Sequence, residues 1–205
     1  MEKTTYYKTL PDGYVPVKTV DAKDKKFAIW MNVAATLLML AVGTVTYLLR
    51  FVAFPNAHRA LRESMASLQD NIWALEGFCF GFVAAMLVYM VLHEVTHGIV
   101  YKLRTHEKLT FGVRLSCAYC GVPGIYATRE TALLSLLAPF TVWNVVFIAA
   151  MCLTSGALSF GFLVLFASHF GGCAGDLYDT YLLLTSLKGD VLVSDDGPTQ
   201  VFYRK

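Results

Sequence analysis

The sequence predicts an all-α integral membrane protein with four transmembrane helices and a β-hairpin in the loop between the second and third helices. Three observations lead to this fold class. Hydrophobic residues make up 56% of the 205 residues and charged residues only 16%, whereas soluble domains carry about 25% charged residues. Four apolar stretches reach the roughly 20 residues that a membrane helix needs. Lys and Arg are distributed unevenly between the connecting segments.

Composition also excludes several classes of protein. A net charge of +2, with no run of Lys and Arg, argues against a nucleic-acid partner. Fourteen Phe and eleven Tyr exclude a disordered chain. The five Cys are an odd number, and three of them lie in apolar runs, which does not fit a secreted disulfide framework. The expected partner is therefore the lipid bilayer.

The four predicted spans cover residues 27–49, 72–100, 131–153 and 158–187. The first span follows 26 mostly polar residues and is too long for the apolar region of a signal peptide, so we expect it to remain as an anchor. The chain then divides into an N-terminal tail (1–26), a four-helix membrane region (27–187) and a C-terminal tail (188–205).

The positive charges predict the orientation of these spans. The N-terminal tail, the second loop and the C-terminal tail together hold 14 of the 17 Lys and Arg residues. Segments rich in Lys and Arg stay in the cytoplasm. We therefore expect a multi-pass protein of the cell membrane with both termini cytoplasmic.

The second loop carries a strand pattern. Apolar and polar residues alternate from Leu109 to Ser116, the period of a half-buried strand. Gly121–Gly124 has the composition of a turn, and Ile125–Thr128 could form a returning strand. A cytoplasmic β-hairpin and an ordinary surface loop both fit this pattern.

Ionisable residues inside the apolar stretches occur only in the second and fourth spans. Such a group costs about 2.5–3.5 kcal/mol at the bilayer centre on insertion scales, so it usually serves a function. We therefore expect these two spans to face each other across a site. The residues concerned are Glu76, His93, Glu94, His97, His169, Asp176 and Asp179.

His93–His97 reads HExxH. On a helix the two imidazoles, four residues apart, lie on one face and can bind one Zn²⁺, while Glu94 can act as general base on the metal-bound water. The alternative is a pair of histidines hydrogen-bonded inside the helix bundle. That alternative would also bury Glu94 without a chemical role.

A catalytic zinc needs a third protein ligand and an open position. Asp176 is the best candidate, because it lies deep in the fourth span behind Gly171, Gly172 and Gly175. Small residues allow another helix to approach closely, and they loosen the helix that carries them. We expect such an approach beside Gly175.

Other polar residues have weaker predicted roles. His169, seven residues before Asp176, could be a hydrogen-bond donor to the site, an oxyanion stabiliser or an alternative ligand. Asp179 could contribute to the site or be hydrated at the mouth of the bundle. Asn144 fits helix packing or a substrate contact. Cys117–Cys120 reads CxxC, but without a second pair it is more typical of a structural or incidental feature.

These motifs resemble those of two related groups of proteins. HExxH late in one membrane helix with an Asp deep in a later one is similar to the site-2 protease type of intramembrane metalloprotease. In those enzymes an Asn precedes the ligand Asp by eight residues and a Gly follows it, whereas Ser168 and Leu177 stand here. A closer resemblance is to small bacterial four-span membrane proteins described as "putative zincin peptidases". It rests on His93–Gly98, Tyr119–Cys120, Leu137–Pro139, Gly175–Leu177 and Asp195–Pro198 before Phe202.

The resemblance implies Zn²⁺ held by His93, His97 and Asp176, with Glu94 as base, in a bacterial inner membrane. It also implies that the second-loop hairpin presents an extended substrate by strand addition, a known mode of peptide recognition. The predicted function is a zinc-dependent intramembrane or juxtamembrane peptidase acting on membrane proteins or peptides.

Two other classes of protein are alternatives to a peptidase. A non-proteolytic membrane regulator or scaffold that retains a metal site is the main alternative, although a scaffold does not need Glu94. A metal-ion transporter is less favoured, because the four spans show no inverted repeat and too few acidic groups along a path.

Overall fold

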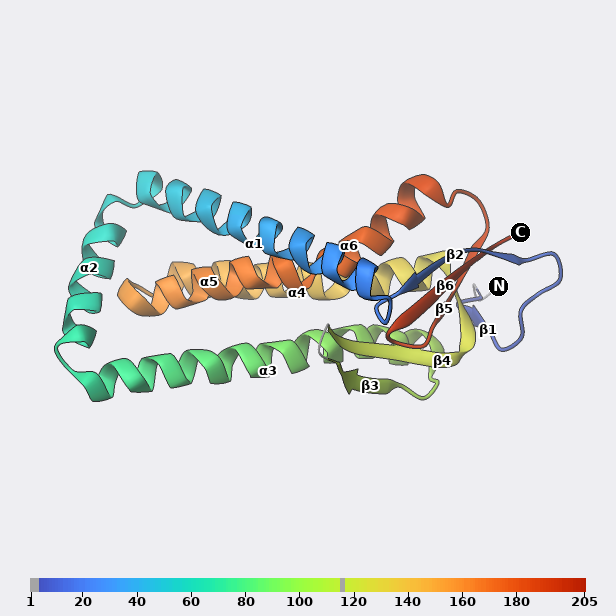
Figure 1. Ribbon diagram of the computed structural model, residues 1–205, viewed down its shortest axis with the longest axis horizontal. Coiled ribbons are helices and arrows are strands. Elements are labelled where there is room, and N and C mark those ends of the chain that lie inside the picture. The colour runs from blue at the N-terminus through green and yellow to red at the C-terminus, as the bar shows by residue number, and fades with distance from the viewer. Residues whose placement is uncertain (1–3, 115–116) are drawn as a thin grey trace. The chain divides into compact units, whose positions relative to one another are not determined.

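The computed structural model describes residues 4–114 and 117–205 of the chain, which are mostly helical with a small antiparallel sheet (Figure 1). The chain forms two compact units. Unit 1 contains Met1–Val33, Val91–Pro139 and Ala174–Lys205, and unit 2 contains Ala34–Met90 and Phe140–Cys173. Long helices contribute residues to both units, since the chain passes from one unit to the other four times.

The long helices are α1 (Lys25–Ala53), α3 (Ile72–Thr105) and α4 (Arg129–Leu153). Within the described residues these three are long and apolar enough to cross a membrane. The shorter helices are α2 (Pro55–Gln69), α5 (Gly156–Gly172) and α6 (Ala174–Tyr181), and a π-helical turn, Leu182–Ser186, follows α6. Counting α5 and α6 as one broken span would give a fourth crossing.

Helix α1 is apolar on every side and buries none of its residues. Leu37, Leu40 and Leu48, for example, each expose more than half of their surface. A helix that is hydrophobic all round belongs in a protein core or in lipid. These exposed apolar faces are therefore compatible with a membrane protein.

The predicted fourth span is not one continuous helix. Regular α-helix stops at Gly172, Cys173 has backbone angles of φ −77° and ψ 0°, and α6 begins at Ala174. The glycines before the break weaken the helix there, because glycine loses more conformational entropy in a helix than other residues do. As a result Asp176 lies in the first turn of a new helix.

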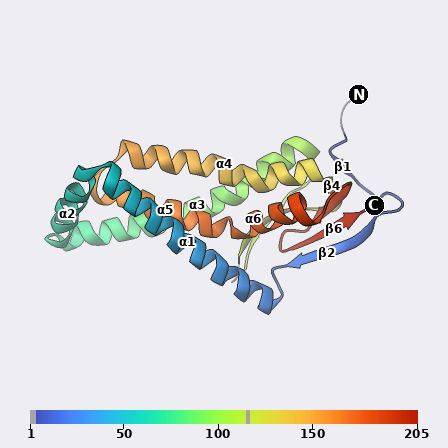
Figure 2. The ribbon, with the colours of Figure 1, turned by 90° about the horizontal axis from the view of Figure 1, so that it is seen from above.

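Helix α2 was not predicted, because residues 55–69 were taken as part of a loop. Pro55 stands at the start of α2, where its fixed φ suits a helix and its missing N–H is not needed. Ser64 of α2 accepts a hydrogen bond at 2.7 Å from the backbone N–H of Ala157. This bond ties α2 to the first turn of α5 within unit 2, and Figure 2 shows the two helices together.

The sheet belongs to unit 1 and uses both tails of the chain (Figure 1). Its described strands follow the order β1-β4-β5-β6-β2, with β3 also paired to β4, and every pairing is antiparallel. Strands in these two tails were not predicted. The strands are β1 (Tyr6–Tyr7), β2 (Val15–Asp21), β3 (Thr110–Val113), β4 (Ala118–Thr128), β5 (Val191–Asp195) and β6 (Thr199–Arg204).

The predicted hairpin in the second loop exists, but its turn is elsewhere. Strand β3 pairs with Ala118–Gly121, so the predicted turn at Gly121–Gly124 lies inside β4. Gly121 serves close approach instead, because a Cβ there would collide with the backbone of Gly197 in the β5–β6 turn. Leu115 and Ser116, which the alternation placed in the first strand, lie outside the described residues.

Each unit has its own hydrophobic core. In unit 1, Ala132 and Leu136 of α4 and Leu183 of the π-helical turn pack against Val193 and Phe202 of the sheet. In unit 2, Tyr89, Phe147, Leu165 and Phe166 form an aromatic-rich cluster between helices. The unit 1 core fixes the start of α4 and the π-helical turn after α6 against the sheet.

Candidate metal centre

Unit 1 brings His93 and His97 of α3 together with Asp176 of α6. His93 Nε2 lies 3.3 Å from Asp176 Oδ2, and His97 Nε2 lies 3.4 Å from Asp176 Oδ1. Both imidazoles are buried, and the side chain of Asp176 is 18% exposed. The spacing of four residues on a helix places both rings on one face, and the break before α6 sets Asp176 against that face.

The hydrogen bonds around these groups leave three ligand atoms pointing at one another. His97 Nδ1 lies 2.9 Å from the Ser135 carbonyl oxygen and donates to it. This bond leaves the lone pair of Nε2 directed toward Asp176, the arrangement usual in metal-binding histidines. Asp176 Oδ2 is buried and accepts no hydrogen bond from the described residues.

The donor set fits a zinc ion. Zn²⁺ in proteins takes imidazole nitrogen and carboxylate oxygen at about 2.0–2.1 Å in a tetrahedron, which corresponds to ligand–ligand distances of about 3.3 Å. The two nitrogen–oxygen distances, 3.3 and 3.4 Å, agree with that value. The three ligand atoms lie within 4.8 Å of one another. A cation would also relieve the repulsion between imidazole lone pairs and a buried carboxylate.

Glu94 lies beside the cluster and is only partly buried. Its carboxylate accepts a hydrogen bond from the backbone N–H of Cys120 in β4. Because Glu94 directly follows His93, the helix turns its side chain about 100° away from the ligand face. The carboxylate is thus held next to the three ligand atoms without being one of them.

Gly98 lets the β3–β4 hairpin pack directly on the HExxH helix. A Cβ at this position would stand 2.8 Å from Phe111 Cζ, 3.1 Å from Leu109 Cδ1 and 3.3 Å from Cys120 Sγ. Any side chain here would therefore push β3 and β4 off the helix. The hairpin and the HExxH segment form one packed structure.

A second row of polar groups links the site to the C-terminal strands. Tyr101 lies one turn beyond His97, and its hydroxyl donates to Asp195 Oδ2 at 2.9 Å. Asp195 Oδ1 accepts the Gly197 N–H, also at 2.9 Å. Burial raises the pKa of Asp195 to about 6, although those two donors act in the opposite direction. Asp195 stands out in the sequence only as part of a motif, since its partner is 94 residues away.

The other predicted site residues have different positions. Asp179 is 5% exposed, which contradicts the alternative of a carboxyl hydrated at the bundle mouth, and its Oδ1 has no hydrogen-bond partner among the described residues. A contribution of Asp179 to the site stays a prediction. His169 belongs to unit 2, where its Nδ1 lies 2.6 Å from the Tyr89 hydroxyl. Asn144 also belongs to unit 2, and its Oδ1 is buried without a described hydrogen-bond partner.

The space around Gly175 differs from the prediction. A Cβ at Gly175 would meet no described atom within 4 Å, so the expected close helix approach beside Gly175 was wrong.

Cys120 is buried in β4, and burial, followed by the nearby Asp195 and Glu94 charges, raises its thiol pKa to about 12. This thiol stays protonated at neutral pH, which agrees with a structural role for this cysteine of the CxxC pair.

Two histidines at positions i and i+4 of a helix, together with a carboxylate from another segment, are the set of metal ligands found in HExxH metallopeptidases. A family model described as "Putative zincin peptidase" matches residues 86–191, slightly more than half of the chain. The chain belongs to this family, as the sequence resemblance predicted. No curated protein matches the chain, and no solved structure matches it.

Proposed function

We propose that the protein is a zinc-dependent peptidase of the cell membrane, multi-pass, with both termini in the cytoplasm. The observation that carries this proposal is the convergence of His93, His97 and Asp176 with Glu94 alongside. The family name supports a zinc peptidase. The long apolar helices support a membrane location. Cleavage within or next to the membrane, as in site-2 type proteases, is part of the same proposal.

In this proposal His93 Nε2, His97 Nε2 and Asp176 hold the metal. When bound, Zn²⁺ lowers the pKa of water to about 7 and polarises a carbonyl group. The Ser135 carbonyl keeps His97 in the tautomer that presents Nε2. Tyr101 and Asp195 hold the next turn of α3 against the C-terminal strands, which keeps the ligands aligned.

Glu94 is the proposed general base. Its carboxylate takes the proton from the attacking water and then delivers it to the leaving amide nitrogen, so no proton accumulates at the site. The Cys120 N–H holds one end of this carboxylate in place. Positioned acid–base groups of this kind contribute about 10²- to 10⁴-fold in rate.

The proposed substrate is an extended peptide segment of a membrane protein or a free peptide. Strand β3 pairs with β4 on one side, and its other edge has no strand partner among the described residues. Phe111 and Val113 of β3 expose 51% and 70% of their surface. A segment added to this edge would lie next to the HExxH helix, because Gly98 contacts Phe111.

The proposal is tested with purified protein in detergent, using single-span model substrates and elemental analysis of the same samples. We expect wild type to hold one zinc per chain and to cleave. Glu94→Gln should keep its zinc and lose at least about 100-fold in cleavage rate. Glu63→Gln, an exposed position on α2, is the matched control and should behave as wild type.

Two outcomes would contradict the mechanism. Equal cleavage by Glu94→Gln and wild type would remove Glu94 as the base. One zinc per chain with no cleavage of any substrate offered would favour the non-proteolytic regulator or scaffold instead.

A further inference from the structure

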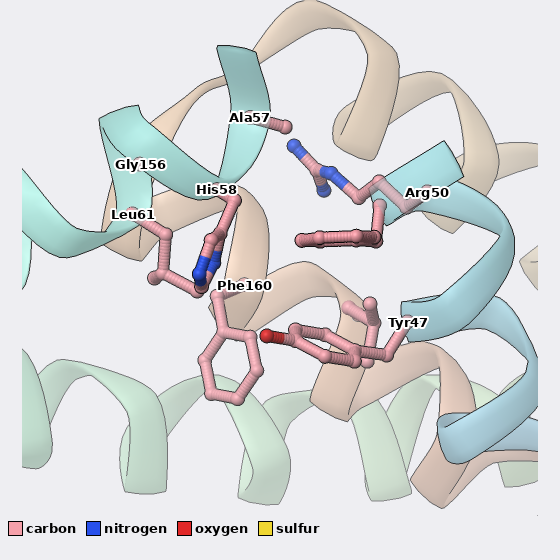
Figure 3. A pocket seen from close by; sticks show the side chains of 9 residues that line it. Tyr47, Arg50, Ala57, His58, Leu61, Gly156 and Phe160 are labelled. Carbon is pink, nitrogen blue, oxygen red and sulfur yellow. The ribbon is translucent and has the colours of Figure 1, made fainter. Parts of the chain in front are cut away.

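Unit 2 contains a pocket that the proposed peptidase mechanism does not use. It lies where the end of α1, the first half of α2 and the start of α5 meet, and Figure 3 shows its side chains. All three segments belong to the same compact unit. The lining residues are Tyr47, Arg50, Phe51, Ala57, His58, Leu61, Gly156, Phe160 and Leu163.

One end of this pocket offers hydrogen-bond donors to an anion. Arg50 Nη1 donates to the Ser159 carbonyl at 3.4 Å, and the other guanidinium N–H groups meet no acceptor among the described residues. His58 Nδ1 is buried and also lacks a described hydrogen-bond partner. The Tyr47 hydroxyl points into the same space (Figure 3). None of the nine lining residues is acidic, so this end of the pocket favours an anionic group.

An apolar groove continues from this polar end. It shares Tyr47, Leu61, Phe160 and Leu163 with the pocket. From there it follows α1 and α5 past the close approach of Gly43 and Ala167 and ends at Met39. A Cβ at Gly43 would stand only 3.2 Å from that of Ala167. Figure 2 shows α1 beside α5.

The length of the combined feature matches one leaflet of a bilayer. On α1, Met39 at the far end of the groove and Arg50 at the polar end of the pocket are eleven positions apart, or about 16 Å of helix. Half of a bilayer's hydrocarbon core is about 15 Å thick. Arg50 lies in the last turn of the apolar helix α1, where a spanning helix meets the headgroup region.

We propose that the pocket and groove bind one anionic glycerophospholipid. Its phosphate lies at Arg50 and His58, where charge-assisted hydrogen bonds form. One acyl chain lies along the groove between α1 and α5. Because no carboxylate lines the pocket to pair with an ammonium headgroup, phosphatidylglycerol is preferred over phosphatidylcholine. The inference rests on the membrane location in the proposed function.

The test uses full-length protein, delipidated in detergent and titrated with phosphatidylglycerol or phosphatidylcholine of identical acyl chains, with bound lipid counted by native mass spectrometry. We expect one tightly bound phosphatidylglycerol and at least about tenfold weaker phosphatidylcholine. Arg50→Gln should weaken phosphatidylglycerol about tenfold. Arg59→Gln removes the same charge at an exposed position outside the pocket and should have no effect.

Further experiments distinguish binding of the whole lipid from binding of its phosphate group alone. Thr44→Phe fills the groove without changing charge and should also weaken binding, whereas Arg50→Lys should retain most of it. Inorganic phosphate should neither bind nor compete. The inference is overturned by equal affinity for the two lipids, by full binding to folded Arg50→Gln and Thr44→Phe, or by phosphate binding alone. Recovery of the protein in the soluble cell fraction would instead contradict the membrane location.

Discussion

The two compact units differ in the polar groups that they bury. Unit 1 buries His93, His97, Asp179 and Asp195 near a sheet, and hydrogen bonds with the Ser135 carbonyl and the Tyr101 hydroxyl hold His97 and Asp195 in place. Unit 2 exposes large apolar side chains such as Trp73, Phe80 and Leu48, and it buries His169 against Tyr89 and other aromatic rings. We therefore expect zinc binding and cleavage to depend on unit 1 and not on unit 2. The predictions below test that division.

The largest expected effect follows loss of the carboxylate ligand. Asp176→Ala should lose its zinc and on the order of a thousandfold or more of any cleavage activity, because two imidazoles alone hold the metal poorly. Elemental analysis and a cleavage assay on one preparation check both. Asp190→Ala, an exposed carboxylate of the same unit, should change neither. Full zinc occupancy in Asp176→Ala would mean that Asp176 is not a ligand.

A smaller loss is expected where the hairpin packs on the HExxH helix. Gly98→Ala should lower cleavage about 10- to 100-fold, because its Cβ would displace Phe111 and Leu109 and so shift Glu94 relative to the ligands. Gly175→Ala lies next to Asp176 in open space and should stay close to wild type. Equal rates for the two variants would show that the hairpin does not position the site.

The third prediction concerns pH and Asp195. Its pKa is raised by burial from 3.8 to about 6, so the folded state holds this proton more tightly than the unfolded state does. The resulting stabilisation is complete below about pH 4 and is lost as pH rises to about 6, a change of about 3 kcal/mol. Asp195→Asn lacks this dependence. Thermal melting of both proteins at pH 4.5 and 7.5 should therefore favour wild type more at the lower pH.

An unchanged difference between wild type and Asp195→Asn at the two pH values would mean that Asp195 has an ordinary pKa. Because each comparison is made at one pH, titration of the remaining groups largely cancels.

The smallest effect is expected in unit 2. Tyr89→Phe removes the buried hydrogen bond to His169 Nδ1 and should cost about 1 kcal/mol, or about 2–4 °C in melting temperature. Zinc content and cleavage should remain, since the proposed metal site uses His93, His97 and Asp176. Loss of zinc from this variant would return His169 to the list of metal-site residues and break the division between the units.

The three long helices and the HExxH segment were predictable from sequence because their signals are local. Apolar length identified α1, α3 and α4, and the spacing of His93 and His97 placed both imidazoles on one face. Asp176 was predicted as a ligand because an ionisable group inside an apolar stretch is costly in free energy and because glycines precede it. The structure brings His93, His97 and Asp176 together, which gives the predicted metal site a geometry.

The sheet was not predictable in the same way, because its pairings are long-range. Strand β2 lies in a Lys-containing tail and pairs with β6 at the other end of the chain, so neither short segment carries a strong signal alone. Tyr101 and Asp195 likewise meet only after the sheet forms. Gly121 was misassigned to a turn, because sequence does not distinguish a glycine needed for a turn from one needed for close packing.

X-ray absorption at the zinc edge of the purified protein tests the central claim most directly, because it reports which atoms surround the metal. We predict one zinc per chain with two imidazole nitrogens and carboxylate oxygen at about 2.0–2.1 Å, and no sulfur. Sulfur at about 2.3 Å would place a cysteine at the metal and contradict the assignment of His93, His97 and Asp176. A protein that takes up no zinc would contradict the proposed metal centre as a whole.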